Sequence, residues 1–222
     1  MTSRIICSLL TTLLLLALDK QLYAQSNFYE EEYKSFSGGA LIGLNLAQVD
    51  GDRYFGYKKP GIVAGVFVNV QLSAKWGLGV EMLYSQKGSR GDAVVESVYA
   101  GTYIAQCHIG LSYIELPVVV RYKKSKYVGE AGISYNRLVK TNETILEPQP
   151  LYIDAEKNRF SSTDINYVLG IGRHLHKQLH CGVRFHYSIV DIRPMERIPS
   201  GYGYGTRGQF NNLFSIRLIY QL

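Results

Sequence analysis

The sequence predicts an all-β fold, an eight-stranded antiparallel up-and-down transmembrane β-barrel with short periplasmic turns and long extracellular loops. Three observations predict it. Apolar and polar residues alternate with a period of two in eight segments, the connections alternate between short and long, and 18 Tyr and 22 Gly accompany only 6 Pro in 222 residues. Period-two alternation is typical of strands, and no segment shows a helical period. Alternating short and long connections over an even number of strands are typical of outer-membrane barrels.

The eight expected strands share one pattern, in which apolar side chains occupy every second position and glycine or polar side chains lie between them. The expected strands span residues 39–46, 61–72, 76–87, 113–122, 127–136, 164–172, 179–188 and 211–222. The short turns are residues 73–75, 123–126 and 176–178. The long polar or glycine-rich loops are residues 48–59, 88–107, 140–163 and 191–210.

The start of the chain predicts a signal peptide and hence export. Arg4 supplies a positive charge, residues 5–18 form an apolar stretch, and residues 22–24 resemble a small-residue cleavage site. The apolar stretch of about 14 residues is shorter than the roughly 20 that a transmembrane helix needs. We therefore expect a signal peptide over residues 1–24, a short polar N-terminal lead-in over residues 25–36, and the barrel over residues 37–222.

Two cysteines, Cys107 and Cys181, remain after removal of the signal peptide. Exported proteins favour disulfides. The strand map, however, places these two residues near opposite ends of the fold, too far apart for a bridge. We expect both thiols to be free.

Charged residues in the middle of the strands indicate which face points inward. They lie in phase with many glycines, on the face opposite the apolar one. The lumen of an eight-stranded barrel is just wide enough for side chains to fill, and charges buried there need partners. We therefore expect a network of mutually paired charges in the lumen, formed by Glu81, Glu115, Glu130, Arg121, Arg184 and Arg217.

Aromatic residues mark both ends of the apolar face, as in the aromatic girdles of membrane barrels. The girdle beside the short turns and the C-terminus consists of Trp76, Tyr122, Tyr127 and Tyr220. The girdle beside the long loops consists of Tyr84, Tyr135 and Tyr187. The last five residues, 218–222, also alternate, and they resemble the final-strand signal used in outer-membrane assembly.

Four segments resemble PorT-like outer-membrane β-barrel proteins. They are residues 39–52, 57–65, 76–87 and 113–122, and the Tyr-Ile-Glu-Leu-Pro sequence that begins at Tyr113 is the most specific piece. The resemblance covers nearly the whole mature chain. It implies an eight-stranded barrel in a Gram-negative outer membrane and, for the namesake branch, a link to type IX secretion and gliding.

Residues that could bind metal are better explained by structure. Four histidines lie around or beyond one short turn, but no nearby cysteine or carboxylate completes a zinc or copper site. These histidines are His174, His176, His180 and His186. Residues 50–52, Asp-Gly-Asp, supply too few oxygen ligands for calcium and are typical of a turn. We expect no metal and no cofactor.

The long loops contain the residue types that outer-membrane enzymes use at their outer rim. They are Ser89, Asp92, Ser97, His108, Asp154, Asp164 and Asp191. Their spacing pairs no nucleophile with a base, so we do not expect an enzyme. Tyr202, Tyr204 and Arg207 in the last loop could bind a glycan or a partner protein, but aromatic outer loops are ordinary in such barrels, and we favour that interpretation.

The sequence therefore predicts a small integral outer-membrane β-barrel with a structural or interaction role and a lumen closed by Glu/Arg pairs. The alternatives are a PorT-like component of a type IX secretion or gliding machine, a lipid-active enzyme at the outer rim, and a narrow pore. The expected partners are outer-membrane lipid and, through the resemblance, envelope or secretion-machine proteins. The net charge of +6 includes no basic run of the kind that binds nucleic acid.

Overall fold

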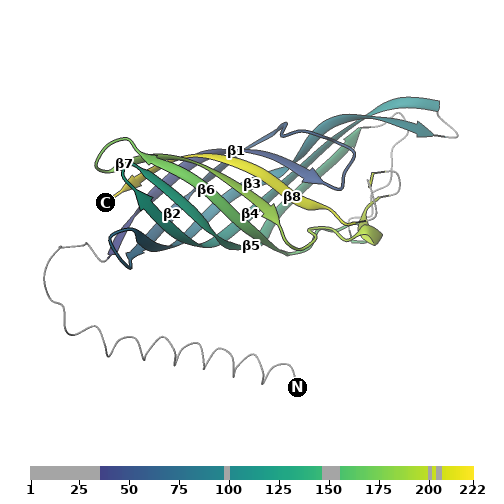
Figure 1. Ribbon diagram of the computed structural model, residues 1–222. Coiled ribbons are helices and arrows are strands. Elements are labelled where there is room, and N and C mark those ends of the chain that lie inside the picture. The colour runs from purple at the N-terminus through teal and green to yellow at the C-terminus, as the bar shows by residue number, and fades with distance from the viewer. Residues whose placement is uncertain (1–35, 98–100, 147–155, 200–201, 204–206) are drawn as a thin grey trace, which may run out of the picture. The chain divides into compact units, whose positions relative to one another are not determined.

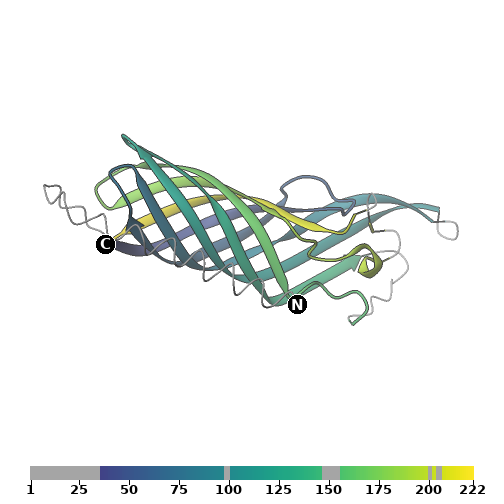
Figure 2. The ribbon, with the colours of Figure 1, turned by 60° about the horizontal axis from the view of Figure 1, so that its bottom comes forward.

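In the computed structural model of the chain, eight antiparallel strands form a closed barrel. Each strand pairs with its neighbours in sequence, and β1 pairs with β8. The strands are β1 (Phe36–Asp50), β2 (Lys59–Gln71), β3 (Trp76–Ser97), β4 (Gly101–Lys124), β5 (Tyr127–Leu146), β6 (Thr163–His174), β7 (Leu179–Ser188) and β8 (Phe210–Gln221). Figure 2 shows them tilted around the barrel. This architecture confirms the predicted fold class.

The structure describes residues 36–97, 101–146, 156–199, 202–203 and 207–222. The predicted signal peptide lies outside this part of the chain, as do the lead-in up to residue 35, Asp154 and Tyr204. The side chain of Ser97 is also outside it. Apart from the strands, the described residues contain one 3-10 turn, Met195–Arg197. Within them, no helix has the length and apolar character needed to cross a membrane.

The alternation of the sequence becomes an alternation of outward and inward side chains. In β1, Ile42 and Leu44 are 62% and 59% exposed, whereas Asn45 is fully buried inside the barrel. The same pattern in β3 exposes Met82 and buries Glu81. The barrel therefore turns its apolar face outward and its polar face inward, as a membrane barrel does.

β3, β4 and β5 extend farthest beyond the bounds that the sequence indicates. β3 and β4 contain 22 and 24 residues and remain paired up to Ser97 and Gly101, and β5 continues to Leu146. The expected loop boundaries at residues 88–107 and 140–163 are therefore wrong, since both begin or end inside paired strands. Figure 1 shows the β3–β4 hairpin projecting beyond the neighbouring strands.

One strand pairing is locally irregular. Pro117 lies in the middle of β4, where it has no N–H to donate, and two pairs are missing from the β3–β4 ladder between Val80–Val118 and Leu83–Glu115, although the register is the same on both sides. A register shift occurs in the β4–β5 pair between Ser112 and Tyr113. A shift of this kind twists a strand locally and changes the direction of its side chains.

Both cysteines of the described chain are free. Cys107 is buried and Cys181 is partly exposed. This agrees with the expectation of two unpaired thiols.

Candidate functional site

Five charged side chains meet inside the barrel near its short-turn end. We call them the basal network: Glu81, Glu130, Arg121, Arg184 and Arg217. Arg184 is fully buried between the two carboxylates. Its Nη1 and Nη2 each donate to Glu81 at 2.8 Å, and its Nε and Nη2 donate to Glu130 at 2.9 and 2.8 Å. Charge-assisted, bidentate pairs of this kind are the strong class of protein hydrogen bonds.

The other two arginines share the same carboxylates. Arg121 donates from Nη2 to Glu81 at 2.5 Å and from Nε to Glu130 at 3.3 Å. Arg217 donates from Nη2 to Glu130, and its Nη1 lies 3.6 Å from Glu81. Three guanidinium groups thus share two carboxylates, so the basal network has a net charge of +1.

Glycines opposite these long side chains make room for them. An added Cβ at Gly79 would lie 2.5 Å from Arg121 Nη1, and one at Gly170 would lie 2.5 Å from Glu130 Oε1. Gly170 is paired in register with Glu130 on one side and with Arg184 on the other. A larger residue at either glycine would displace a charged group of the network.

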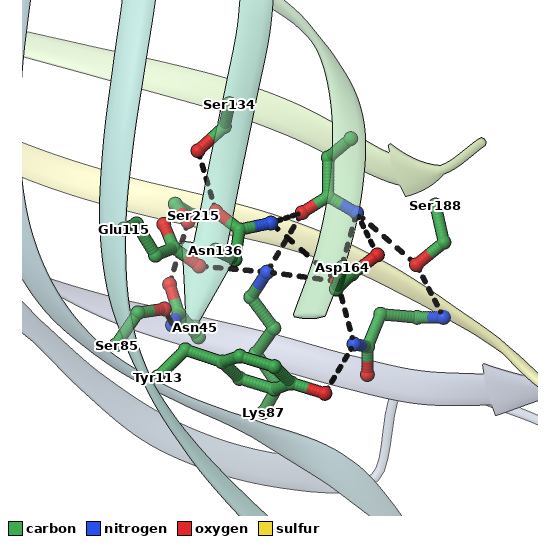
Figure 3. A network of polar contacts seen from close by, with 12 residues as sticks. Asn45, Ser85, Lys87, Tyr113, Glu115, Ser134, Asn136, Asp164, Ser188 and Ser215 are labelled. Carbon is green, nitrogen blue, oxygen red and sulfur yellow. Dashed lines mark hydrogen bonds and ion pairs between the residues drawn. The ribbon is translucent and has the colours of Figure 1, made fainter. Parts of the chain in front are cut away.

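A second cluster, the Lys87 network, lies farther toward the long-loop end. Lys87 follows Glu81 by six residues in β3, which corresponds to about 20 Å along a strand. Its Nζ lies 2.6 Å from Glu115 and 3.8 Å from Asp164, and it donates to Asn166 at 3.0 Å. Figure 3 shows how buried amide and hydroxyl groups surround these charges. The labelled members of this surrounding shell are Asn45, Ser85, Tyr113, Ser134, Asn136, Ser188 and Ser215.

The structure divides the six predicted lumen residues between the two clusters. Five of them form the basal network, whereas Glu115 pairs with Lys87. Lys87 and Asp164 were not among the predicted network residues, although both are fully buried and lie in phase with the inward positions of their strands. That alternation was the signal that could have found them.

An apolar cluster lies where the outer loops pack onto the barrel, and we call it the outer core. It consists of Val49, Tyr54, Cys107, Ile109, Leu111, Tyr113, Phe160, Ile192 and Tyr202. Beside it, Arg193 makes a bidentate pair with Glu143, at 2.9 and 2.5 Å, and its guanidinium carbon lies 3.6 Å from the centroid of the Phe160 ring. Burial in this region raises the pKa of the Cys107 thiol to about 12.

Residues 23–193 match the family model described as outer membrane protein beta-barrel domain. The chain belongs to this outer-membrane β-barrel family. Membership accounts for the exposed apolar belt around the barrel, because lipid replaces water on that side.

Solved structures with a similar fold include two of Ail, the attachment invasion locus protein of Yersinia pestis. One, in complex with the heparin analogue sucrose octasulfate, has a TM-score of 0.45 and 10% identity and covers 85% of this chain and 99% of Ail. The other has a TM-score of 0.43 and 12% identity, covering 84% and 98%. Neisserial surface protein A (NspA) has a TM-score of 0.43 and 8% identity, covering 86% and 99%. No curated protein sequence matches the chain.

The predicted girdle residues of this outer-membrane barrel lie on its outer face to different degrees. Trp76, Tyr127, Tyr135 and Tyr220 are exposed, whereas Tyr84, Tyr122 and Tyr187 are partly buried. The rings of Trp76 and Tyr122 pack at 4.8 Å, and Tyr187 stacks on Tyr167 at 5.6 Å. The sequence analysis did not include Tyr167 in a girdle; it lies opposite Tyr187 and extends the aromatic surface from β7 onto β6.

The candidate metal ligands do not gather into a site. His174 and His180 lie against each other across β6 and β7, with ring centroids 3.8 Å apart, whereas His186 is buried in the lumen. Over the part of the chain that the structure describes, no three His, Cys, Asp or Glu residues are grouped as metal ligands.

The Asp-Gly-Asp sequence forms turn contacts. Asp50 accepts hydrogen bonds from Gln48 at 2.7 Å and from Asn212 at 3.0 Å, and Asp52 accepts one from the Tyr54 backbone at 2.8 Å. Gly51 has a φ of 90°, which suits a tight turn. Burial raises the pKa of the Asp52 carboxyl to about 7.

Proposed function

We propose that this outer-membrane barrel acts through the surfaces it presents, as a structural or interaction protein with a closed lumen. The observation that carries the proposal is the filling of the lumen by paired charges: the basal network near one end, the Lys87 network farther along, and the outer core beyond them. A conducting pore needs a water-filled path lined by unpaired polar groups. Within each network, the charged groups instead pair with one another.

The proposal predicts that the barrel does not conduct. In planar-bilayer recordings, the purified chain is expected to give no stable conductance steps. Regular single-channel steps from the unaltered chain would overturn the closed-lumen part of the proposal. Arg53→Met, a substitution of an exposed arginine outside the barrel strands, is the matched control for preparation and insertion.

The proposal involves no substrate turnover. Ser89 and His108 are the predicted rim residues best suited as nucleophile and base, but they face opposite sides of the β3–β4 hairpin. Arg90 is paired in register with His108, and Ser89 with the outer-core residue Ile109. Successive residues of a strand point to opposite faces, so Ser89 points away from His108. Asp164, another predicted rim residue, is committed to the Lys87 network.

The surface that we propose for interaction is the long-loop end. There the β3–β4 hairpin and β5 continue as paired strands beyond the β2 and β6 neighbours. A strand-paired extension holds its side chains in fixed positions, which lowers the entropy lost when a partner binds.

The PorT-like alternative makes the periplasmic side the contact surface. In situ cross-linking followed by pull-down from intact outer membranes separates the two cases. The test compares the unaltered chain with a variant whose residues 89–106 are replaced by a short turn and with a variant whose turn lysines Lys123, Lys124 and Lys126 are changed to Gln. Loss of a partner only in the first variant supports the outer surface. Loss only in the second supports a secretion or gliding component, and an unchanged secreted proteome after deletion would contradict that alternative.

We also propose that residues 1–24 are removed on export to a Gram-negative outer membrane. Intact-mass measurement of the chain recovered from membranes tests this. A mass that includes residues 1–24 would contradict it.

A further inference from the structure

A cavity of about 240 Å³ opens at the short-turn end of the barrel, the end at which the C-terminus lies (Figure 1). In barrels of this type that end faces the periplasm. The cationic residues that line the cavity are Lys75, Arg121, Lys123, Arg173, Lys177 and Arg217. Glu130 is the one carboxylate in the described lining, and its oxygens already accept from three arginines. The cavity is therefore strongly positive.

Hydrogen-bond donors at the base of this cavity lack partners. The Arg217 side chain is only 2% exposed, yet its Nε and Nη1 make no hydrogen bond to any described residue. Arg121 Nη1 is in the same condition. A guanidinium group stays charged in proteins, so it cannot relieve the cost of a buried, unsatisfied N–H by losing a proton. An acceptor at the base of the cavity would satisfy these donors.

The charge balance points the same way. The basal network holds three guanidinium groups and two carboxylates, which leaves one positive charge. The Lys87 network has the opposite imbalance, with one ammonium and two carboxylates. Glu115 lies opposite Leu83, two residues from Glu81, so the two networks adjoin and offset each other in part. The cavity itself lies at the other side of the basal network, where the described lining adds four more cations and no further carboxylate. An anion in the cavity would neutralise the excess charge where it lies.

We propose that this cavity binds a small oxyanion, with a phosphate group as its best ligand. Arg121 and Arg217 would donate to the phosphate oxygens from the base. Lys75, Lys123 and Lys177 would attract the anion at the rim. Arginine suits this role because its planar set of donors matches the oxygens of phosphate. The volume admits a phosphate or a phospholipid headgroup but not acyl chains. The phosphate is therefore either inorganic or belongs to a lipid of the inner leaflet.

The test uses the full mature chain in a zwitterionic detergent and measures binding by calorimetry at constant ionic strength, with chloride as the reference anion. The two probes are inorganic phosphate and a short-chain phosphatidylglycerol below its micelle concentration. Saturable binding of inorganic phosphate supports a free-phosphate site. Binding of the lipid alone supports a headgroup site, and binding of neither overturns the proposal.

Variants locate the binding. Arg121→Met removes a base donor and is expected to weaken binding at least tenfold. Because this variant also disturbs the basal network and can fail to fold, Lys123→Gln at the exposed rim provides an independent test, with an expected loss of about threefold from one lost surface charge. Lys140→Gln, an exposed lysine at the opposite end, is the matched control. Equal affinity in the unaltered chain and Lys123→Gln, or equal losses in Lys123→Gln and Lys140→Gln, would overturn the assignment to this cavity.

Discussion

Replacing Arg184 by Met is expected to destabilise the barrel strongly, because it removes the central cation of the basal network. The substitution keeps a side chain of similar length, so the main loss is electrostatic. Arg184 makes four hydrogen bonds to Glu81 and Glu130. At about 1.5–3 kcal/mol for each bond to a charged group, their sum is an upper bound of roughly 6–12 kcal/mol.

The expected loss is smaller than that bound. Both carboxylates retain Arg121 and Arg217 as partners, so they are not left fully uncompensated. Removal of one partner from a buried ion pair costs about 3–5 kcal/mol, and we expect a value in that range. With an m-value of about 2 kcal/mol/M, this loss lowers the urea midpoint by about 2 M.

Unfolding is measured by urea titration in lipid vesicles, with the fluorescence of the single tryptophan, Trp76, as the signal. Arg53→Met is the surface control, and we expect its free energy of unfolding to change by less than about 1 kcal/mol. In the double variant Arg184→Met/Glu81→Gln, the loss should be smaller than the sum of the single losses, because both changes remove the same Arg184–Glu81 hydrogen bonds. A loss below about 1 kcal/mol in Arg184→Met, or strict additivity in the double variant, would refute the reasoning.

Lys87→Met leaves Glu115 and Asp164 buried without their cation, and it should lower the free energy of unfolding by about 3–5 kcal/mol in the same urea titration. Adding Glu115→Gln should recover part of this loss. Equal stability of the single and double variants would contradict this. The Asp52 pKa is raised from 3.8 to about 7, so the stability that its protonated form provides is present below about pH 4 and lost as the pH rises through 7. Asp52→Asn should therefore slow hydrogen exchange of the first outer loop at pH 8 and have little effect near pH 4, with a difference that grows by at most about 1.4 kcal/mol per pH unit; a difference independent of pH would exclude this role. Trp76 is expected near the lipid headgroups, so its fluorescence should be quenched more by lipids brominated close to the headgroup than by lipids brominated at the chain ends, and the reverse order would contradict the girdle.

The strand pattern could be predicted because lipid and lumen impose opposite demands on alternate residues. Leu44 and Asn45 differ sharply in exposure, and the apolar character of Leu44 predicts that it is the one that points outward. This constraint ends where the strands leave the membrane. Around Ser89 the sequence of the β3–β4 hairpin becomes polar and glycine-rich, so it resembles a loop although the strands remain paired.

The partners of the lumen charges could not be predicted from any single strand. Glu115 and Glu81 both lie on inward positions, but one pairs with Lys87 and the other with Arg184. The choice depends on the stagger between strands, which no single strand reveals. The resemblance to PorT-like proteins gives information about the interior of the barrel. Tyr113 and Glu115, two residues of its most specific segment, lie in the interior, so that segment reports on how the barrel is filled.

The pairing of β1 with β8 has a consequence for how the chain is made. Gly39 pairs with Gln221 and Asp50 with Phe210, so the seam of the barrel joins the two ends of the sequence. Until β8 has been synthesised, the sheet keeps two open edges, and a lipid bilayer offers no hydrogen-bond partners for them. Contacts between such distant residues also form slowly. Insertion must therefore wait for the last 12-residue strand, and a truncated chain that lacks it would remain an aggregation-prone, uninserted sheet.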